Sequence, residues 1–283
     1  MSKSERKELI IPVTFTTAET QQALAMLNRC VRMDAARLQQ LLVKADSHLS
    51  VITEGADLAA AALLTRDASG FTLYLARGHG QSDPVAVDRL TEPLRQAMAA
   101  SPSIAATVML DGYDAEAAQY CAAQGHRQID CDYLLSTNSS GSHGGLAVHP
   151  YRPEELAEYI RVFDQAFLPL RAANGREPYA LWSSRPDWAQ EWFEGAAARG
   201  EMASIWIDGQ MAACYRLDGD TIDSLAVLPE RQGRGIGRAI INHCISEIRG
   251  KGYPRAYLYV AETNLRARSL YEQMGFQIEM ISR

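Results

Sequence analysis

The sequence has little that would tie it to a membrane, to nucleic acid or to an oxidising compartment. Its longest small-apolar run, Leu58 to Leu64, is far shorter than the roughly 20 residues needed to span a bilayer. With 28 Lys and Arg against 34 Asp and Glu, the formal net charge is −6, so no bulk attraction to nucleic acid or anionic lipid is expected. The 5 cysteines form no CxxC pair, and the 6 histidines show no metal-ligand spacing. The N-terminus lacks the apolar core of a secretory signal, so a soluble, cytoplasmic protein without a metal site is predicted.

A Ser/Gly-rich stretch near the middle of the 283 residues, from Ser136 to Gly145, has no hydrophobic periodicity and is typical of a linker. We therefore expect one domain over residues 1–136, a flexible and exposed linker over 137–144, and a second domain over 145–283.

The second half predicts a mixed α/β sheet with an antiparallel meander in its middle. Two apolar runs joined at Asp208-Gly209 indicate a β-hairpin, and apolar residues at helical spacing from Ile236 to Ile248 indicate an amphipathic helix. In order, we expect a strand at 145–148, helices from 153 and around 188–192, strands at 202–207, 211–217 and 221–228, a helix from 236, a strand at 255–261, a helix at 264–274 and a strand at 276–281.

The first half predicts a similar order with weaker signals, ending in a strand near 128–135. One stretch matches the second half at an offset of 150 residues. The matching positions are Asp114, Ala117, Tyr120 and Gly125 with Asn264, Ala267, Leu270 and Gly275. The weak repeat and the shared order of elements indicate a duplicated fold.

The stretch that carries chemistry runs from Leu225 through a proline break and a glycine-rich loop into the helix that follows. Glycines at 233, 235 and 237 let backbone N–H groups converge at the helix N-terminus, which favours a phosphate group. Arg231, Arg234 and Arg238 add positive charge, so a pyrophosphate-bearing ligand is predicted. A Walker A loop is excluded because Arg238-Ala239 stands where Lys-Ser/Thr is required, and the dinucleotide fingerprint fails because its third glycine would fall at Arg238.

The pattern Gln232-x-x-Gly235-x-Gly237 resembles the acetyl-CoA-binding motif of the GNAT superfamily of N-acetyltransferases. A second hallmark follows it, Asn264-x-x-Ala267-x-x-Leu270-Tyr271-Glu272-x-x-Gly275-Phe276. The resemblance covers about residues 145–283. The first half lacks the glycine loop, and Arg77-Gly-His-Gly80 is its nearest counterpart. The resemblance implies an α/β fold of two tandem GNAT-like domains, the first degenerate, each with a mixed, mainly antiparallel sheet flanked by helices. The family usually has one more strand after the strand at 276–281, and we expect the N-terminal strand at 8–15 to complete the sheet in its place.

The resemblance also implies an acetyl-CoA-dependent N-acetyltransferase that needs no metal. In this family an amine attacks the thioester directly in a ternary complex. The implied acetyl-CoA-binding residues are Leu225, Ala226, Val227, Gln232, Gly233, Arg234, Gly235, Ile236, Gly237, Arg238 and Asn264. Tyr271 is the expected acid for the leaving thiolate, with a core aromatic as the alternative, and Asn264 can also cap its helix.

Two carboxylates are candidates for the general base. Asp223 lies two residues before Leu225 and by strand alternation is expected on the same face, although a solvated carboxylate at the hairpin end is the alternative. Glu262, at the end of the next strand, is the second candidate.

Aromatic residues gather between 151 and 200, where some are expected to line the acceptor pocket. Asp164, Glu177 or Glu194 could attract a cationic amine there. The predicted partner is a small-molecule amine, with no nucleic acid and no membrane, and a homodimer is kept as one alternative. Two other functions stay open: a non-catalytic acyl-CoA-binding sensor or scaffold, and a protein N-acetyltransferase.

Overall fold

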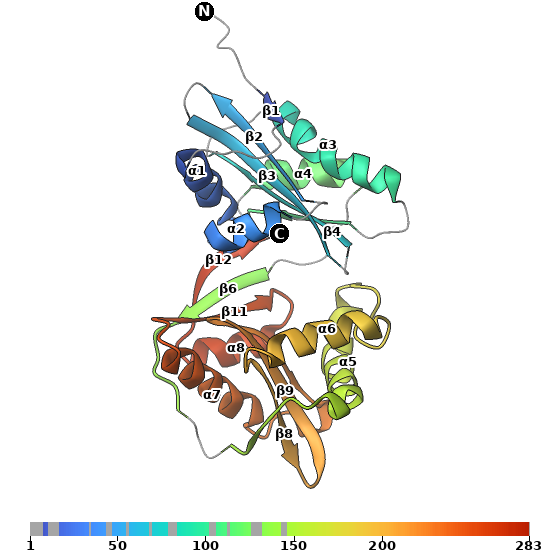
Figure 1. Cartoon of the computed structure of the whole chain (residues 1–283), viewed down its shortest axis with the longest axis vertical. Helices are drawn as coiled ribbons and strands as arrows, with labels where there is room; N and C mark the ends of the chain where they lie inside the picture. The colour runs from blue at the N-terminus through green and yellow to red at the C-terminus, as the bar shows by residue number, and fades with distance from the viewer. Residues whose placement is uncertain are drawn as a thin grey trace, which may run out of the picture. The chain divides into compact units, whose positions relative to one another are not determined.

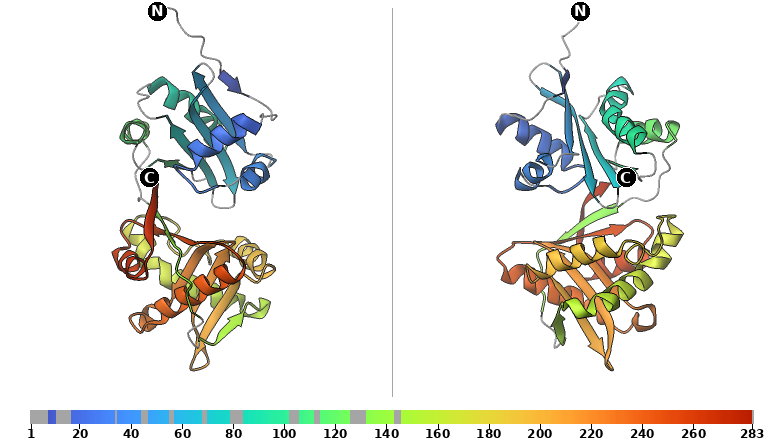
Figure 2. Two further views of the ribbon diagram at one scale, coloured as in Figure 1. Left: turned by 90° about the vertical axis from the view of Figure 1, so that its left-hand side faces the viewer. Right: turned by 45° about the vertical axis from the view of Figure 1, so that its right-hand side comes forward.

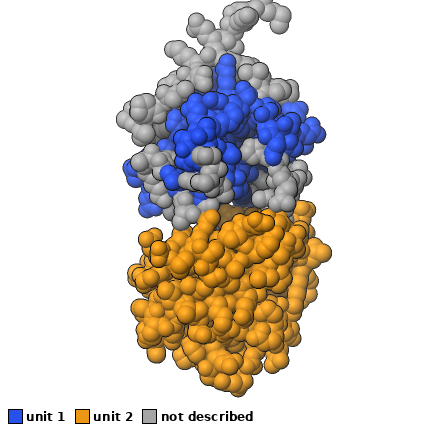
Figure 3. All heavy atoms as spheres, turned by 90° about the vertical axis from the view of Figure 1, so that its right-hand side faces the viewer, with its two compact units in different colours: residues 1–131, 280–283 blue, residues 132–279 orange. Residues whose placement is uncertain are grey.

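A computed structural model of the chain describes residues 8–10, 17–33, 35–43, 47–54, 57–67, 70–78, 84–101, 106–111, 114–125, 132–142 and 146–282. The chain forms two compact units, one of residues 1–131 with 280–283 and the other of residues 132–279. Figure 1 labels their elements and Figure 3 colours them separately. Among the described residues, no helix has an apolar stretch that could cross a bilayer.

The first unit is a five-stranded sheet with helices on both faces. Its strands are β1 (Glu8–Ile10), β2 (His48–Glu54), β3 (Asp57–Asp67), β4 (Gly70–Arg77) and β5 (Ala106–Leu110), in that spatial order. Each neighbouring pair is antiparallel except β4 and β5, which are parallel. Alternation along β3 sends Ala61 and Leu63 toward α1 (Thr17–Leu27) and α2 (Ala35–Leu42). Ala60, Ala62 and Leu64 face α3 (Pro84–Ala100) and α4 (Ala115–Ala123).

The second unit repeats this order around a seven-stranded sheet. Its strands are β7 (Val148–Pro150), β8 (Met202–Ile207), β9 (Gln210–Asp218), β10 (Thr221–Val227), β11 (Ala256–Ala261), β6 (Asp132–Thr137) and β12 (Gln277–Ser282), and its spatial order is β12-β6-β11-β10-β9-β8-β7. The meander from β7 to β10 is antiparallel and β10 is parallel to β11. The predicted hairpin is confirmed, with Asp208 and Gly209 at φ 55° and 74° between β8 and β9.

Helices cover both faces of the second sheet (Figure 2). A short turn (Pro153–Glu155) leads into α5 (Leu156–Ala173), which packs with α6 (Pro186–Ala197) in an aromatic cluster that includes Cys214 and Ala226. The other face holds α7 (Ile236–Gly250), where His243 contacts Tyr215 of β9. The last helix is α8 (Leu265–Gln273).

The weak sequence repeat corresponds to equivalent structures. Asp114 caps the N-terminus of α4 by accepting a hydrogen bond from the Ala117 amide at 3.0 Å. Asn264, 150 residues later, caps α8 by accepting one from the Ala267 amide at 3.3 Å. Both sheets are mixed and mainly antiparallel, as predicted.

Strand β6 is where the sequence prediction was wrong. The strand expected at 128–135 to finish the first half lies instead in the second sheet, between β12 and β11, and pairs with β11 from Thr137↔Ala256 to Asp132↔Ala261. Residues 128–131 are outside the described residues. The expectation that the N-terminal strand completes the second sheet was also wrong, because β1 pairs with β2, and residues 11–15 are not described. A run such as Tyr133–Thr137, buried throughout, predicts a central strand without saying which sheet it joins.

Part of the predicted linker lies against α7, while its residues Asn138, Ser140 and Ser142 are exposed. Ser142 donates its amide to the carbonyl of Asn242 at 3.2 Å. Gly141 adopts φ +65°, and a Cβ atom there would come within 2.9 Å of Asn242, Ile245 and Ser246. Residues 143 and 144 lie outside the described residues. The backbone therefore requires glycine at 141. From composition alone, a glycine in such a stretch predicts only flexibility.

Candidate functional site

The two parallel strands of the second sheet diverge where the site begins. β10 and β11 pair only at Thr221↔Tyr257 and Ile222↔Leu258. β10 stays paired with β9 on its other edge as far as Val227↔Ala213. Beyond Ile222 the β11-facing edge of β10 therefore offers backbone groups that no sheet partner uses.

A cavity of about 1010 Å³ opens at this divergence. It is bounded by β10, the loop before α7, β11, the start of α8 and the α5–α6 region. Of the predicted site residues, those that line it are Asp223, Leu225, Val227, Gln232, Gly233, Gly235, Gly237, Arg238, Asn264 and Tyr271. Ala226, Arg234 and Ile236 do not line it, and the Ala226 side chain packs in the aromatic cluster.

The glycine loop has the backbone geometry that its composition predicts. Gly233 and Gly235 adopt φ 77° and 80°, in the left-handed region where a Cβ atom is strained. Gly235 is the N-cap of α7, and the first helical bond runs from the Ala239 amide to the Gly235 carbonyl at 3.0 Å. The amides of residues 236–238 thus precede the helical hydrogen-bond ladder, at the end where the helix dipole favours an anion.

The Gln232 side chain links this loop to the end of β10 and to α8. Its Nε2 donates to the Val227 carbonyl at 2.9 Å, and its Oε1 accepts from Arg266 at 3.0 Å. Sequence reasoning missed Arg266, which lines the cavity from α8, because nothing in the motif shows that α8 begins beside the loop. Arg238 donates to Gln273 of α8 at 2.8 Å, so two arginines, Arg238 from α7 and Arg266 from α8, lie on the loop side of the cavity.

Tyr271 lies on the α8 side of the cavity, with its ring 5.9 Å from that of Phe276. Burial raises the pKa of the Tyr271 phenol to about 12. The group is therefore protonated at neutral pH and can donate a proton. The ring packs on a core aromatic and also lines the cavity, so the acid role of Tyr271 stays a prediction.

Asp223 does not share the face of Leu225, contrary to the expectation from alternation. The pairing of β10 with β9 shifts between Ile222 and Ser224, so Asp223 sits in a bulge that resets the alternation. The Asp223 carboxylate lies 2.7 Å from Arg216, whose guanidinium stacks 4.6 Å from the centre of the Trp192 ring on α6. Leu225 instead pairs with Tyr215, on the α7 face.

The other acidic candidates do not line the cavity. Asp164 accepts the amides of Trp182 and Ser183, each at 3.0 Å, and so fixes the loop before α6. Glu177 and Glu194 are exposed and outside the cavity lining, as is Glu262, which accepts from the Tyr133 hydroxyl at 3.0 Å. These acids are therefore not placed to bind a substrate in this cavity.

Aromatic side chains do form the α5–α6 wall, as predicted. Phe167, Trp182, Trp188 and Trp192 line the cavity. Trp182 packs against Phe163 and Phe167 in tilted contacts, with ring centres 4.9 and 5.4 Å away.

In the described part of the first unit, the counterpart strands stay paired rather than diverging. β4 and β5 pair at five positions, from Phe71↔Ala106 to Leu75↔Leu110. Arg77, at the end of β4, corresponds by the offset of 150 to Val227 and bonds Asp114, the counterpart of Asn264, at 2.8 Å. The Arg77 side chain is buried and that of Asp114 is half-buried. Residues 79 and 80 of the predicted loop counterpart are not described.

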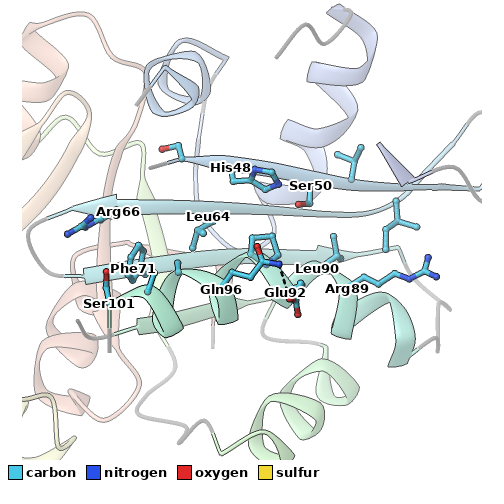
Figure 4. Close-up of a pocket in the computed structure, with 16 residues that line it drawn as sticks. His48, Ser50, Leu64, Arg66, Phe71, Arg89, Leu90, Glu92, Gln96 and Ser101 are labelled. Carbon is cyan, nitrogen blue, oxygen red and sulfur yellow. Dashed lines mark hydrogen bonds between the residues drawn. The ribbon is translucent and has the colours of Figure 1, made fainter. Parts of the chain in front are cut away.

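A separate hollow of about 480 Å³ lies between α3 and strands β2 and β3 (Figure 4). Polar side chains such as His48, Arg66, Arg89 and Gln96 line it together with Phe71. It includes no residue of β5 or α4, so it is not the counterpart of the cavity in the second unit.

Comparison with known proteins places this geometry in a family. The model of the Acetyltransferase (GNAT) family matches residues 167–276. A 110-residue stretch is 36% identical to the mycothiol acetyltransferase of Beutenbergia cavernae, over 38% of this chain and 32% of that protein. A 101-residue stretch is 33% identical to the ribosomal protein bS18 alanine N-acetyltransferase of Salmonella typhimurium, over 34% of this chain and 68% of that protein.

Solved structures share the fold over the whole chain. A GCN5-related N-acetyltransferase from Sphaerobacter thermophilus has a TM-score of 0.68 at 15% identity, covering 98% of this chain and 93% of that one. A tandem GNAT protein from the clavulanic acid biosynthesis pathway has a TM-score of 0.56 at 15% identity, covering 98% and 96%. The chain spans a third to two thirds of the two curated relatives above. It belongs to the GNAT acetyltransferase family, with two GNAT-like folds in tandem.

Proposed function

We propose that the second unit transfers an acetyl group from acetyl-CoA to a primary amine of a small molecule, and that the first unit is a degenerate copy without a coenzyme site. The observation that carries this proposal is the divergence of β10 and β11 next to the glycine loop. The edge of β10 from Leu225 to Val227 can hydrogen-bond the pantetheine arm. The amides at the start of α7 can bind the pyrophosphate, with Arg238 and Arg266 beside them.

The chemistry assigned to the chain's own groups is a direct transfer. The lone pair of the amine attacks the carbonyl carbon of the thioester, a C–N bond forms and the C–S bond breaks. Tyr271, which is protonated at neutral pH, supplies a proton to the leaving sulfur. A backbone N–H near Val227 polarises the carbonyl. Asp223, on the α5–α6 side of the sheet, takes the proton that the amine loses, directly or through water.

The α5–α6 wall favours a small acceptor over a protein tail. Asn174 at the end of α5 donates to the Thr263 hydroxyl at 2.8 Å and ties the wall to the strand–helix junction that bears Asn264. The aromatic side chains of this wall suit an apolar body next to the reacting amine.

A transfer assay on the full chain tests the proposal. We expect thiol release from acetyl-CoA to depend on an added amine, and Tyr271→Phe to lower kcat by roughly 10- to 1000-fold while leaving acetyl-CoA affinity within about twofold. Phe276→Leu, which alters the ring partner of Tyr271 without touching its hydroxyl, is the matched control. Acetyl-CoA binding without amine-dependent thiol release would contradict the transferase and favour a sensor.

A further inference from the structure

The acceptor side of the cavity contains arginines, which a pocket for an amine alone would not require. Arg171, in the last turn of α5, and Arg176, in the loop that follows, both line the cavity on the side of the aromatic wall. Together with Arg185 just before α6, they place three guanidinium groups near one another.

Arg171 has less charge compensation than Arg176. Its Nε donates to the Pro178 carbonyl at 3.0 Å, which fixes the guanidinium plane. Among the described residues no carboxylate is in ion-pair contact with it, whereas Arg176 lies 3.4 Å from Asp132. Burial, and then the nearby charges of Arg176 and Arg185, lower the pKa of Arg171, and the opposing charge of Asp164 does not offset them, so a bound anion would relieve an unfavourable environment.

A second observation on the same wall also points to a ligand oxygen. The indole N–H of Trp182 is buried and has no hydrogen-bond partner among the residues that the structure describes. Buried donors are normally paired, and an unpaired one beside a cavity marks a place where a ligand acceptor would gain free energy.

These arginines are separate from the groups assigned to the coenzyme. The loop side of the cavity has its own arginines, Arg238 and Arg266, at the start of α7 and on α8. Arg171 and Arg176 come from the α5–α6 side, which belongs to the opposite face of the sheet from α7 (Figure 2). With the coenzyme bound at the glycine loop, Arg171 and Arg176 are therefore available to bind the acceptor.

We propose that the acceptor is an amino acid or an amino-acid-like amine whose carboxylate binds Arg171, with Arg176 beside it, and whose apolar side chain packs on the aromatic wall. This inference rests on the proposed transferase function and narrows its substrate class. Guanidinium groups match carboxylates in a two-pronged geometry, so Arg171 also fixes the orientation of the amine relative to the thioester.

Binding is tested first, so that the outcome does not depend on turnover. The probes are 3-phenylpropionate and its neutral amide, titrated by calorimetry into the full chain saturated with CoA. We expect the carboxylate to bind at least tenfold more tightly than the amide, and Arg171→Gln to abolish that difference. Arg161→Gln is the matched control, since Arg161 lies on the same helix outside the cavity lining and pairs with Glu158. Equal binding of the two probes, or no binding of the carboxylate, overturns the inference.

Turnover then separates this inference from the proposed function. Phenylalanine is compared with phenethylamine, which lacks only the carboxylate. In Arg171→Gln, kcat/KM for phenylalanine should fall about 10- to 100-fold and that for phenethylamine less than about threefold. Equal losses for both amines, or a matching loss of acetyl-CoA affinity, would assign the arginines to the fold or the coenzyme. Failure to bind acetyl-CoA at all would instead refute the proposed function.

Discussion

Arg77 lies at the first unit's counterpart of the β10–β11 divergence, and its removal should destabilise that unit selectively. The Arg77 and Asp114 side chains are only 6% and 11% exposed, and Nε lies 2.8 Å from Oδ2. Removing one partner of a buried ion pair typically costs about 3–5 kcal/mol. Asp114 keeps the hydrogen bond from the Ala117 amide and the nearby charge of Arg29, so we expect Arg77→Met to cost about 2–3 kcal/mol.

The tryptophans allow the two units to be followed separately. All 4 tryptophans (Trp182, Trp188, Trp192 and Trp206) belong to the second unit. In a urea titration, the circular dichroism of Arg77→Met should show a transition at lower urea, while the tryptophan fluorescence midpoint stays close to that of the wild type.

A double-mutant cycle with Asp114→Asn shows whether the pair itself is responsible, because asparagine keeps the helix cap and removes the charge. We expect the double variant to lose at least about 1 kcal/mol less unfolding free energy than the two single variants lose together. Additive losses, or an unchanged unfolding curve for Arg77→Met, would refute the reasoning.

The same pair predicts a pH dependence. Burial favours the neutral form of Asp114, but the hydrogen bonds from Arg77 and the Ala117 amide outweigh it and hold its pKa below 3.8. A carboxyl with a depressed folded-state pKa stabilises the fold above its unfolded pKa and loses that contribution as pH falls. The stability difference between wild type and Arg77→Met should therefore shrink below about pH 4.

Three further outcomes follow from the second unit. Burial raises the pKa of Tyr271 to about 12, so kcat should hold at pH 10, where an ordinary tyrosine is half ionised; a fall there would contradict the buried acid. Gly141→Ala should lower the free energy of unfolding by about 2 kcal/mol more than Gly200→Ala. Both glycines have a similar positive φ, but of the two only Gly141 contacts α7. Equal losses in urea titrations would refute that contact. Gly235→Ala should weaken acetyl-CoA binding about fivefold or more through its left-handed backbone, whereas Gly250→Ala at the end of the same helix should not; calorimetry decides between them.

Local signals in the sequence predicted the parts of the fold that depend on neighbouring residues. The Asp208-Gly209 turn, the glycine loop and the amphipathic α7 follow from short-range chemistry, and the structure has each of them. The placement of β6 could not be predicted in this way, because a buried run pairs equally well in either sheet.

The site was harder to predict where one residue changes the geometry. A single bulge at Asp223 reverses the face that alternation assigns, and no sequence pattern marks it. Similarly, the sequence places Asp164 among the acids that could attract an amine. In the structure its carboxylate is buried and accepts two backbone amides instead. Arg171 and Arg176 come together only through the turn after α5, so their joint charge is a property of the folded chain.

The central claim is that the second unit alone binds acetyl-CoA, at the divergence of β10 and β11. Calorimetric titration of the full chain with acetyl-CoA, with NAD and ATP as controls, tests it most directly. We predict one site per chain and no binding of either control. Two sites would show that the first unit's cleft is open despite Arg77, and no binding by the folded protein would contradict the assignment of the cavity.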